Sequence, residues 1–256
     1  MTENLNDTGA RPVVRIGDTV RRLAYWWTPA VHRLLGHLQA VGFEYAPRVL
    51  GFDDEGREVL TYIEGESGAK GWAKIVSDDG LRRFARLLKS YHTAVAGYQP
   101  RGNSEWAYAA GIPGPGEILC HGDFGPWNVV WRAEEPVAIL DWDFVVPATP
   151  RHDVLYALEY SVPFADDEEC LKWRRFAEPP DRRRRIEIFA EAYGLAEVGP
   201  VVNDVAAMQR TVAGYTRHLA ERGLQPQADW VANGALDAQE QKARWTEANR
   251  RLFEVK

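Results

Sequence analysis

The sequence predicts an α+β fold with two lobes, a small β-rich N-terminal lobe at residues 1–63 and a larger, mostly helical lobe at residues 64–256. Three observations predict it. Before residue 64, short apolar segments alternate with turn signals, as paired strands do. After it, apolar residues recur at the spacing of amphipathic helices. Between the two, residues 64–68 combine glycine, serine and glutamate, which is typical of a linker.

The sequence of the first lobe predicts strands and one helix in the order β-β-α-β-β. Gly17 and Asp18 are typical of a two-residue hairpin turn. Thr28 and Pro29 are typical of the N-cap and first position of a helix, and Gly42 ends that helix. The predicted elements are strands at residues 13–16 and 19–22, a helix at 28–41, and strands at 48–52 and 58–63.

The sequence of the second lobe predicts mainly helices, with one pair of strands among them. Apolar stripes at helical spacing predict helices near residues 81–95, 182–196, 201–219 and 237–253. Residues 129–132 and 137–140 are apolar runs joined by Ala-Glu-Glu-Pro, which predicts a hairpin.

The composition argues against several classes of protein. The formal net charge is −6, which is unfavourable for a nucleic-acid partner. No apolar run approaches the ~18 residues of a membrane span, and residues 1–7 are polar and acidic, unlike a signal segment. Cys120 and Cys170 form neither a disulfide framework nor a metal-binding pattern. We therefore expect a cytoplasmic protein that binds no membrane and no nucleic acid, with its oligomeric state open.

The segment HGDFGPWN, residues 121–128, places polar side chains in a tight loop between two apolar runs. Its central Gly-Pro breaks both helices and strands. Asn128 comes directly before the first strand of the predicted hairpin, and Asp141 directly after the second. Because a hairpin brings its two ends together, we expect Asn128 close to Asp141, with Asp123 held nearby by the Gly-Pro turn.

Two carboxylates and an amide around one small volume suit a particular chemistry. Hard oxygen ligands of this kind bind Mg²⁺ together with phosphate oxygens and water. The remaining carboxylate, Asp123, can accept a proton from an attacking hydroxyl. A base, metal ligands and a positioned nucleotide are what phosphoryl transfer requires. The alternative is that Asp123 and Asn128 only cap a turn.

The same residues carry a family resemblance. His121-x-Asp123-x-x-x-x-Asn128 matches the catalytic-loop pattern of protein kinases. With Gly122 in the second position and the sequence DWD at residues 141–143, the chain resembles the aminoglycoside phosphotransferase and choline kinase family. The resemblance implies a bilobal protein-kinase-like fold, and phosphorylation of a small molecule by ATP or GTP with Mg²⁺.

The resemblance also implies a role for each residue. The implied catalytic residues are Asp123, as the base, and His121, which braces the catalytic loop. Asp153 resembles the aspartate that opens the next helix and hydrogen-bonds the loop backbone. The implied metal ligands are Asn128, Asp141 and, as an assisting group, Asp143.

The nucleotide side departs from the family pattern. The resemblance implies a strand lysine on the phosphates that pairs with a helix glutamate. The N-terminal lobe contains no lysine, so Arg22 is the best substitute and Arg21 the second. The predicted helix at 28–41 contains no glutamate, only His32 and Arg33 in that region. This leaves open the alternative of a catalytically weak or inactive kinase-like binding protein.

Two further segments complete the expected nucleotide site. Main-chain groups of Tyr62 and Ile63, at the hinge between the lobes, are expected to bind the edge of the base. Residues 6–10 occupy the place of a phosphate loop, but they contain a single glycine. Pro12 removes one further amide donor.

Charged and aromatic residues surround the expected acceptor side. The resemblance places the acidic run 166–169 and Glu159 beside the acceptor pocket, although charge runs are usually solvated. The basic run 182–185 favours a solvated helix face, with a nucleic-acid-binding module as the alternative. An aromatic wall for a cation would come from Trp142, Tyr156, Tyr160, Trp173 and Trp230.

We therefore predict a small-molecule kinase. It would transfer the γ-phosphoryl group of ATP or GTP to a hydroxyl of a small acceptor, cationic acceptors such as an aminoglycoside or an amino alcohol included. Its partners are a nucleotide and a small-molecule substrate.

Overall fold

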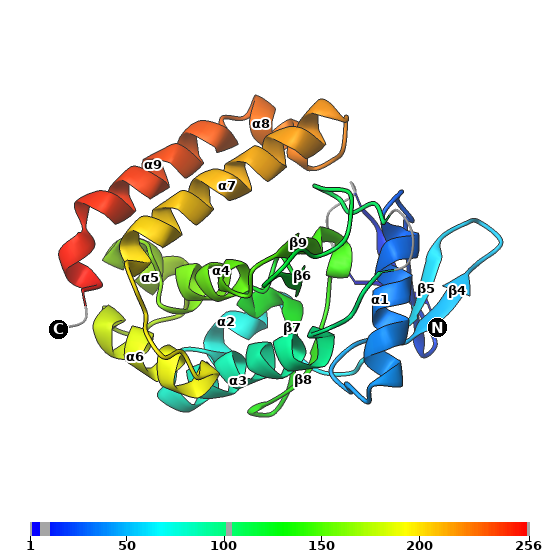
Figure 1. Ribbon diagram of the computed structural model, residues 1–256, viewed down its shortest axis with the longest axis horizontal. Coiled ribbons are helices and arrows are strands. Elements are labelled where there is room, and N and C mark those ends of the chain that lie inside the picture. Colours follow the sequence, from blue (N-terminus) through cyan, green and yellow to red (C-terminus); the bar gives the residue numbers. More distant parts are fainter. Residues whose placement is uncertain (1, 6–10, 101–103, 255–256) are drawn as a thin grey trace.

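The N-terminal part of the chain is a β-sheet with one helix. The computed structural model describes residues 2–5, 11–100 and 104–254, so the predicted phosphate loop at residues 6–10 lies outside the described residues. Five antiparallel strands form the sheet in the order β1-β2-β3-β5-β4 (Figure 1). The elements are β1 (Thr2–Asn4), β2 (Val13–Ile16), β3 (Thr19–Arg22), α1 (Thr28–Ala40), β4 (Val49–Phe52) and β5 (Glu58–Thr61).

The predicted hairpins and helix are present with small differences at their ends. Gly17 adopts a φ of 61° at the turn between β2 and β3, a conformation that glycine tolerates best. The helix spans Thr28–Ala40 against the predicted 28–41, and Trp27 rather than Thr28 takes the N-cap position. Strand β1 was not predicted, since its residues Thr2–Asn4 are polar and exposed. The boundary between residues 63 and 64 stays a prediction.

Helices dominate the rest of the chain, which confirms the predicted α+β class. The first half contains η1 (Gly68–Lys70), α2 (Gly71–Lys74), α3 (Asp78–Val95), β6 (Ile118–Cys120), η2 (Pro126–Asn128), β7 (Val129–Arg132), β8 (Glu135–Ile139), η3 (Trp142–Phe144) and β9 (Val146–Ala148). The second half contains α4 (Arg151–Ser161), α5 (Asp167–Trp173), α6 (Arg182–Tyr193), α7 (Val201–Glu221), α8 (Gln227–Ala232), α9 (Ala235–Ala248) and η4 (Arg250–Leu252).

Two helix pairs enclose the central segment. Helix α3 packs on α6 below α4, and α7 and α9 lie side by side on the opposite side of α4 (Figure 1). Helix α3 begins where the Ser77 side chain accepts a hydrogen bond from the Gly80 amide, and its apolar face is buried throughout. The core between these layers contains Phe84, Phe124 and Trp142. It holds the loop after β6 against α3 and α4.

The expectation of a solvated basic run is wrong for two of its four residues. Arg182 and Arg185 are each only 4% exposed, whereas Arg183 and Arg184 are exposed. Arg185 donates to the carbonyl oxygens of Ser161, Val76 and Ile75, which satisfies a buried cation without a carboxylate. These two side chains are therefore not accessible to a nucleic acid. The acidic run forms the start of the short helix α5, and residues 166–168 are exposed.

Among the described residues, no helix is both long and apolar enough to cross a membrane.

Candidate active site

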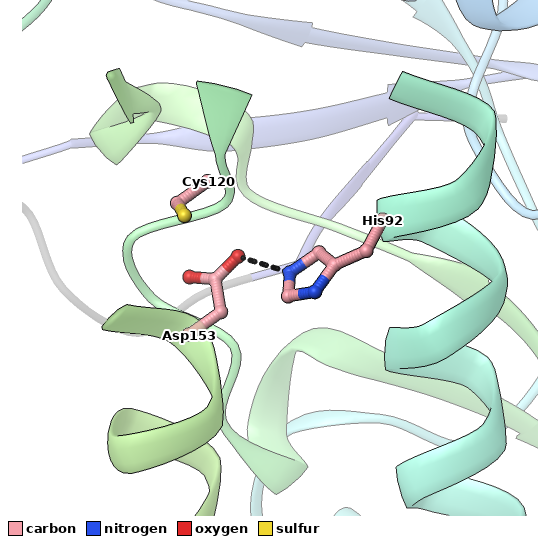
Figure 2. Close-up of side chains that lie close together, drawn as sticks. All are labelled: His92, Cys120 and Asp153. Atoms are coloured by element: carbon pink, nitrogen blue, oxygen red, sulfur yellow. Dashed lines mark hydrogen bonds and ion pairs between the residues drawn. The ribbon is translucent and has the colours of Figure 1, made fainter. Parts of the chain in front are cut away.

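A buried carboxylate fixes the loop that follows β6. Asp153, in the first turn of α4, accepts hydrogen bonds from the backbone amides of His121 at 2.7 Å and Gly122 at 2.8 Å. His92 of α3 lies with its Nε2 3.0 Å from the same carboxylate, as Figure 2 shows. Burial alone would raise the pKa of Asp153, but the hydrogen bond and charge of His92 outweigh it and hold the pKa at about 2. Asp153 thus makes the backbone contacts that the family resemblance implies.

Cys120 lies beside this pair, and the three side chains are close enough to hold a metal ion (Figure 2). Their polar atoms are already engaged, since Asp153 accepts two backbone amides and His92 Nδ1 lies 2.6 Å from the hydroxyl of Tyr193. Burial raises the pKa of Cys120 well above its ordinary value, so the sulfur is a neutral thiol rather than a thiolate ligand. The cluster is better suited to bracing the loop than to binding a metal.

Gly122 is required where the loop passes η3. Its φ is +79°, and a Cβ there would lie 2.0 Å from the carbonyl oxygen of Phe144. A larger residue therefore cannot occupy this position without moving the backbone. The close approach brings the loop against the segment that carries the DWD sequence.

His121 joins the loop to the end of β8. Its side chain is fully buried, with Nε2 2.9 Å from the carbonyl oxygen of Leu140 and Nδ1 accepting the Asp123 amide at 3.3 Å. These partners require a proton on Nε2 and none on Nδ1. Burial lowers the pKa of His121, which favours this neutral form. The ring contacts backbone on both sides, as a bracing role requires.

Asp123 is held at both of its carboxylate oxygens. The Asn128 side-chain amide donates to Oδ2 at 2.8 Å, and the hydroxyl of Tyr156, from α4, donates to Oδ1. Burial raises the pKa of Asp123 to about 7, the charge of Asp141 adds to the rise, and these hydrogen bonds limit it. A carboxyl group with such a pKa can exchange a proton near neutral pH. The sequence placed Tyr156 in an aromatic wall but gave no sign of this contact.

The β7–β8 hairpin brings Asn128 and Asp141 together, as predicted. The amide of Leu140 donates to the carbonyl oxygen of Asn128 at 2.7 Å, directly across the ends of the hairpin. Asp141 adopts a left-handed conformation with φ 56° and ψ 69°, a strained state that is typical of functional sites. Its side chain remains 42% exposed.

Arg22 connects the N-terminal sheet to this hairpin. Its guanidinium lies 3.0 Å from Glu58, 3.1 Å from Asp141 and 2.9 Å from Asp143. Burial lowers the pKa of Arg22, but the charges of the three carboxylates more than offset this and raise it above its ordinary value. Arg21 points elsewhere and pairs with Asp53 at 3.3 Å.

The partner of Arg22 comes from a strand and not from a helix. Glu58 stands opposite Arg22 in the register of β3 and β5 and is only 1% exposed. His32 of α1, in the position where the family pattern implies a glutamate, reaches Glu58 at 3.4 Å. A fixed cation and carboxylate pair is therefore present although the predicted helix contains no glutamate. Sequence reasoning missed Glu58 because it searched the helix alone.

Asp143 differs from Asp141 in its surroundings. Its Oδ1 lies 2.9 Å from Arg22 and accepts the Trp27 indole N–H at 3.2 Å, and its Oδ2 lies 3.6 Å from Arg11. Burial raises the pKa of Asp143 to about 6, against the opposing charge of Arg22. Both oxygens are thus occupied, whereas Asp141 has free exposed surface.

At the expected hinge, the main chain of Tyr62 is hydrogen-bonded and that of Ile63 has no such bond within the described part of the chain. The amide of Tyr62 donates to the carbonyl oxygen of Asp18 at 2.8 Å, which extends the pairing of β3 and β5 by one residue. Arg15 lies over the Tyr62 ring at 3.7 Å. Among the described residues, nothing hydrogen-bonds to the main chain of Ile63, so its amide and carbonyl are free for a base.

A cavity of about 320 Å³ opens beside Asp123. Tyr156, Tyr160 and Trp230 line it, as predicted, whereas Trp142 is buried in the core and Trp173 stands exposed on α5. The expected acidic border is wrong, since Asp166, Glu168 and Glu169 line a separate surface hollow. Glu159 is buried and ion-paired with Lys242. Of the described residues that line the cavity, Asp123 alone is charged.

Comparisons with known proteins show similarity to one family of enzymes. A model of the phosphotransferase enzyme family matches residues 107–188, which include the catalytic-loop pattern and the DWD sequence. The chain is 32% identical over 197 residues to the trifolitoxin immunity protein of Rhizobium leguminosarum bv. trifolii, covering 75% of this chain and 74% of that protein.

Solved structures show the same fold at low sequence identity. The GDP complex of aminoglycoside 2'-phosphotransferase-IIIa has a TM-score of 0.63 and 15% identity, covering 95% of this chain and 92% of that one. A putative aminoglycoside phosphotransferase from Ralstonia eutropha gives 0.60 and 13%, covering 97% and 92%. The ethanolamine kinase of Plasmodium vivax gives 0.59 and 10%, covering 95% and 81%. These likenesses confirm the predicted bilobal protein-kinase-like fold.

Proposed function

Because the chain belongs to the phosphotransferase enzyme family, we propose that it transfers the γ-phosphoryl group of ATP or GTP to a hydroxyl of a small acceptor. One observation carries the proposal. Asp123 lies at the wall of a cavity and is also hydrogen-bonded to Asn128, whose backbone is joined to the residue before Asp141. A base, a pair of oxygen ligands and a space for the acceptor therefore meet at one point.

Asp123 acts as the base in this proposal. The acceptor oxygen attacks the γ-phosphorus and forms an O–P bond, while the bond from that phosphorus to the oxygen bridging to the β-phosphate breaks. The hydroxyl proton passes to Asp123, and the departing nucleoside diphosphate retains the bridging oxygen. The raised pKa of Asp123 suits a group that takes up this proton.

Asn128 and Asp141 fit Mg²⁺ by the chemistry of their donors. The Asn128 side-chain nitrogen donates to Asp123, and its oxygen accepts no hydrogen bond among the described residues. Asp141 adds an exposed carboxylate. When bound, Mg²⁺ supplies charge neutralisation for the phosphates. Asp143, with both oxygens engaged, is proposed to position Arg22 rather than to enter the metal shell directly.

Arg22 is proposed to bind the nucleotide phosphates, with Glu58 orienting its guanidinium. An arginine can contact phosphate through two nitrogens at once. The main chain of Ile63 is proposed to bind the base edge, with Tyr62 beside it. His121 is proposed to hold the loop through its two backbone partners. GDP complexes of structural neighbours support a nucleotide as the co-substrate.

One observation favours a second candidate. The relative in Rhizobium leguminosarum is named for immunity to trifolitoxin, a role that binding without catalysis could also fulfil. The Arg22–Glu58 pair supports catalysis over this alternative, because it supplies the fixed cation and carboxylate that the family pattern requires.

The experiment combines thermal shift and nucleotide hydrolysis. We expect Mg-ATP or Mg-GTP to raise the melting temperature of the wild type and of Asp123→Asn alike. Hydrolysis, with water as the acceptor, is expected to fall by about 10²–10⁴-fold in Asp123→Asn, since general-base catalysis contributes that much. Asp79→Asn, on the exposed first turn of α3, is the matched control and should hydrolyse at the wild-type rate. No stabilisation by either nucleotide would establish the binding-only alternative.

A further inference from the structure

The cavity beside Asp123 is lined by flat, uncharged surfaces. Tyr108 stacks on Tyr215 with ring centroids 4.2 Å apart and an interplanar angle of 7°, and on Phe144 at 5.2 Å. The three rings line the cavity as a stack in which Tyr108 packs face to face on both of the others. Apart from Asp123, the polar lining is neutral and includes the side-chain amides of Gln227 and Gln239.

Apart from the Asp123 carboxylate in the lining, two cations lie close to the rings of the cavity. Lys242 Nζ lies 4.8 Å from the centroid of the Tyr160 ring, and the Arg11 guanidinium lies 5.9 Å from that of Phe144. Both rings line the cavity, so the protein's own cations already occupy positions over two of its aromatic faces. Lys242 also neutralises the buried carboxylate of Glu159. A cationic ligand placed at either of these two rings would meet a like charge.

Resting on the function proposed above, we infer that the acceptor is an uncharged alcohol that carries an aromatic ring system. Its ring would pack on Trp230 and against the edges of the stacked Tyr108 and Tyr215 rings, and its hydroxyl would reach Asp123. A polycationic acceptor would lose its hydration in a cavity with a single carboxylate, which is strongly unfavourable. A cavity of about 320 Å³ suits a ligand of two or more rings.

Trp230 gives the cavity an apolar surface that a ligand can cover. It lines the cavity from α8, yet it is 51% exposed. An aromatic ligand would bury part of this ring. Removing that apolar area from water would favour binding. Trp173 on α5 is 66% exposed and lies outside the cavity, so it offers a matched control.

The test measures binding in the absence of nucleotide. Tryptophol and naphthaleneethanol are the neutral aromatic probes, and kanamycin and choline are the cationic probes. Saturation-transfer NMR and calorimetry are expected to show binding of both neutral probes and at least about tenfold weaker binding of both cations. Trp230→Ala should weaken the neutral probes by about tenfold, and Trp173→Ala should leave them unchanged.

A charge introduced into the cavity gives a second readout. Gln239→Glu adds a carboxylate to the lining, and we expect choline binding to rise by about tenfold relative to the wild type. Failure of both aromatic probes to bind, tighter binding of kanamycin or choline, or equal effects of the two tryptophan substitutions would overturn the inference.

The same experiment separates this inference from the proposed function. If naphthaleneethanol binds as described but no phosphate is transferred to it or to water, the cavity chemistry holds and the kinase proposal fails. If phosphate is transferred to kanamycin but to neither aromatic alcohol, the kinase proposal holds and the inference fails.

Discussion

Arg22 and Glu58 are register partners on β3 and β5, and their side chains meet with Nε of the arginine 3.0 Å from Oε1 of the glutamate. The same guanidinium contacts Asp141 and Asp143, which follow the β7–β8 hairpin. One side chain thus links the N-terminal sheet to the candidate metal ligands. The cation is fixed before any nucleotide arrives, which limits the ordering that binding requires.

Removing Arg22 should be costly because it leaves buried carboxylates unpaired. For Arg22→Ala we expect a loss of about 3–5 kcal/mol in the free energy of unfolding, as for other broken buried ion pairs. Urea denaturation measures this loss. Arg21→Ala on the same strand is the control, and it should lose much less stability because it breaks one ion pair with Asp53, which keeps Arg57 as a second partner. Equal losses of unfolding free energy in the two variants would show that Arg22 contributes no more to stability than Arg21.

Gly122 should tolerate no side chain. In Gly122→Ala the new Cβ would meet the carbonyl oxygen of Phe144 at 2.0 Å, so the loop backbone must shift. We expect nucleotide hydrolysis to fall by at least about tenfold, as small displacements of catalytic groups cost that much or more. Gly17→Ala shares a positive φ of 61° but meets nothing within 4 Å. It should lose about 1–2 kcal/mol of stability from the left-handed backbone and keep its activity.

Asp153 should make stability depend on acidic pH. Its pKa is about 2 in the folded protein against an ordinary value of 3.8, so its stabilising effect is complete above pH 3.8 and is lost as the pH falls through about 2. The groups that face it are His92, His121 and His152. The shift corresponds to roughly 2 kcal/mol, at about 1.4 kcal/mol per pKa unit.

The measurement compares wild type with Asp153→Asn by urea denaturation at a series of pH values. The advantage of the wild type should shrink by roughly 2 kcal/mol between about pH 5 and pH 2, because the asparagine does not titrate. A constant difference across this range would show that Asp153 has an ordinary pKa.

The parts of the site that the sequence predicted are local. Asn128 and Asp141 are joined by one short hairpin, so their proximity follows from turn and strand signals alone. The pairing of Arg22 with Glu58 instead depends on which residues of β3 and β5 stand opposite each other, and that register is set by packing of the whole sheet. No local signal in the sequence therefore indicates the Arg22–Glu58 pair.

The sequence pattern also gave no indication that charged side chains are buried. The run at residues 182–185 has the composition of a solvated surface, yet Arg185 is enclosed because the carbonyl oxygens of Ile75, Val76 and Ser161 converge on it. Likewise, the short strands β6 and β9 contain a proline and pair across 28 residues, without a periodic pattern to mark them. Such contacts between distant segments are beyond local sequence signals.

Tyr156 should influence catalysis through Asp123. Its hydroxyl donates to Oδ1 of the base, so Tyr156→Phe leaves that oxygen without one of its donors while the ring still lines the cavity. We expect hydrolysis of the nucleotide to show a kcat lowered by about tenfold, a typical cost of losing a hydrogen bond to a charged group, with KM for the nucleotide unchanged. Tyr215→Phe removes a hydroxyl from the same cavity with no hydrogen bond to Asp123, and it should leave kcat at the wild-type value. If both substitutions lowered kcat equally, the effect would belong to the cavity as a whole and not to the hydrogen bond that orients the base.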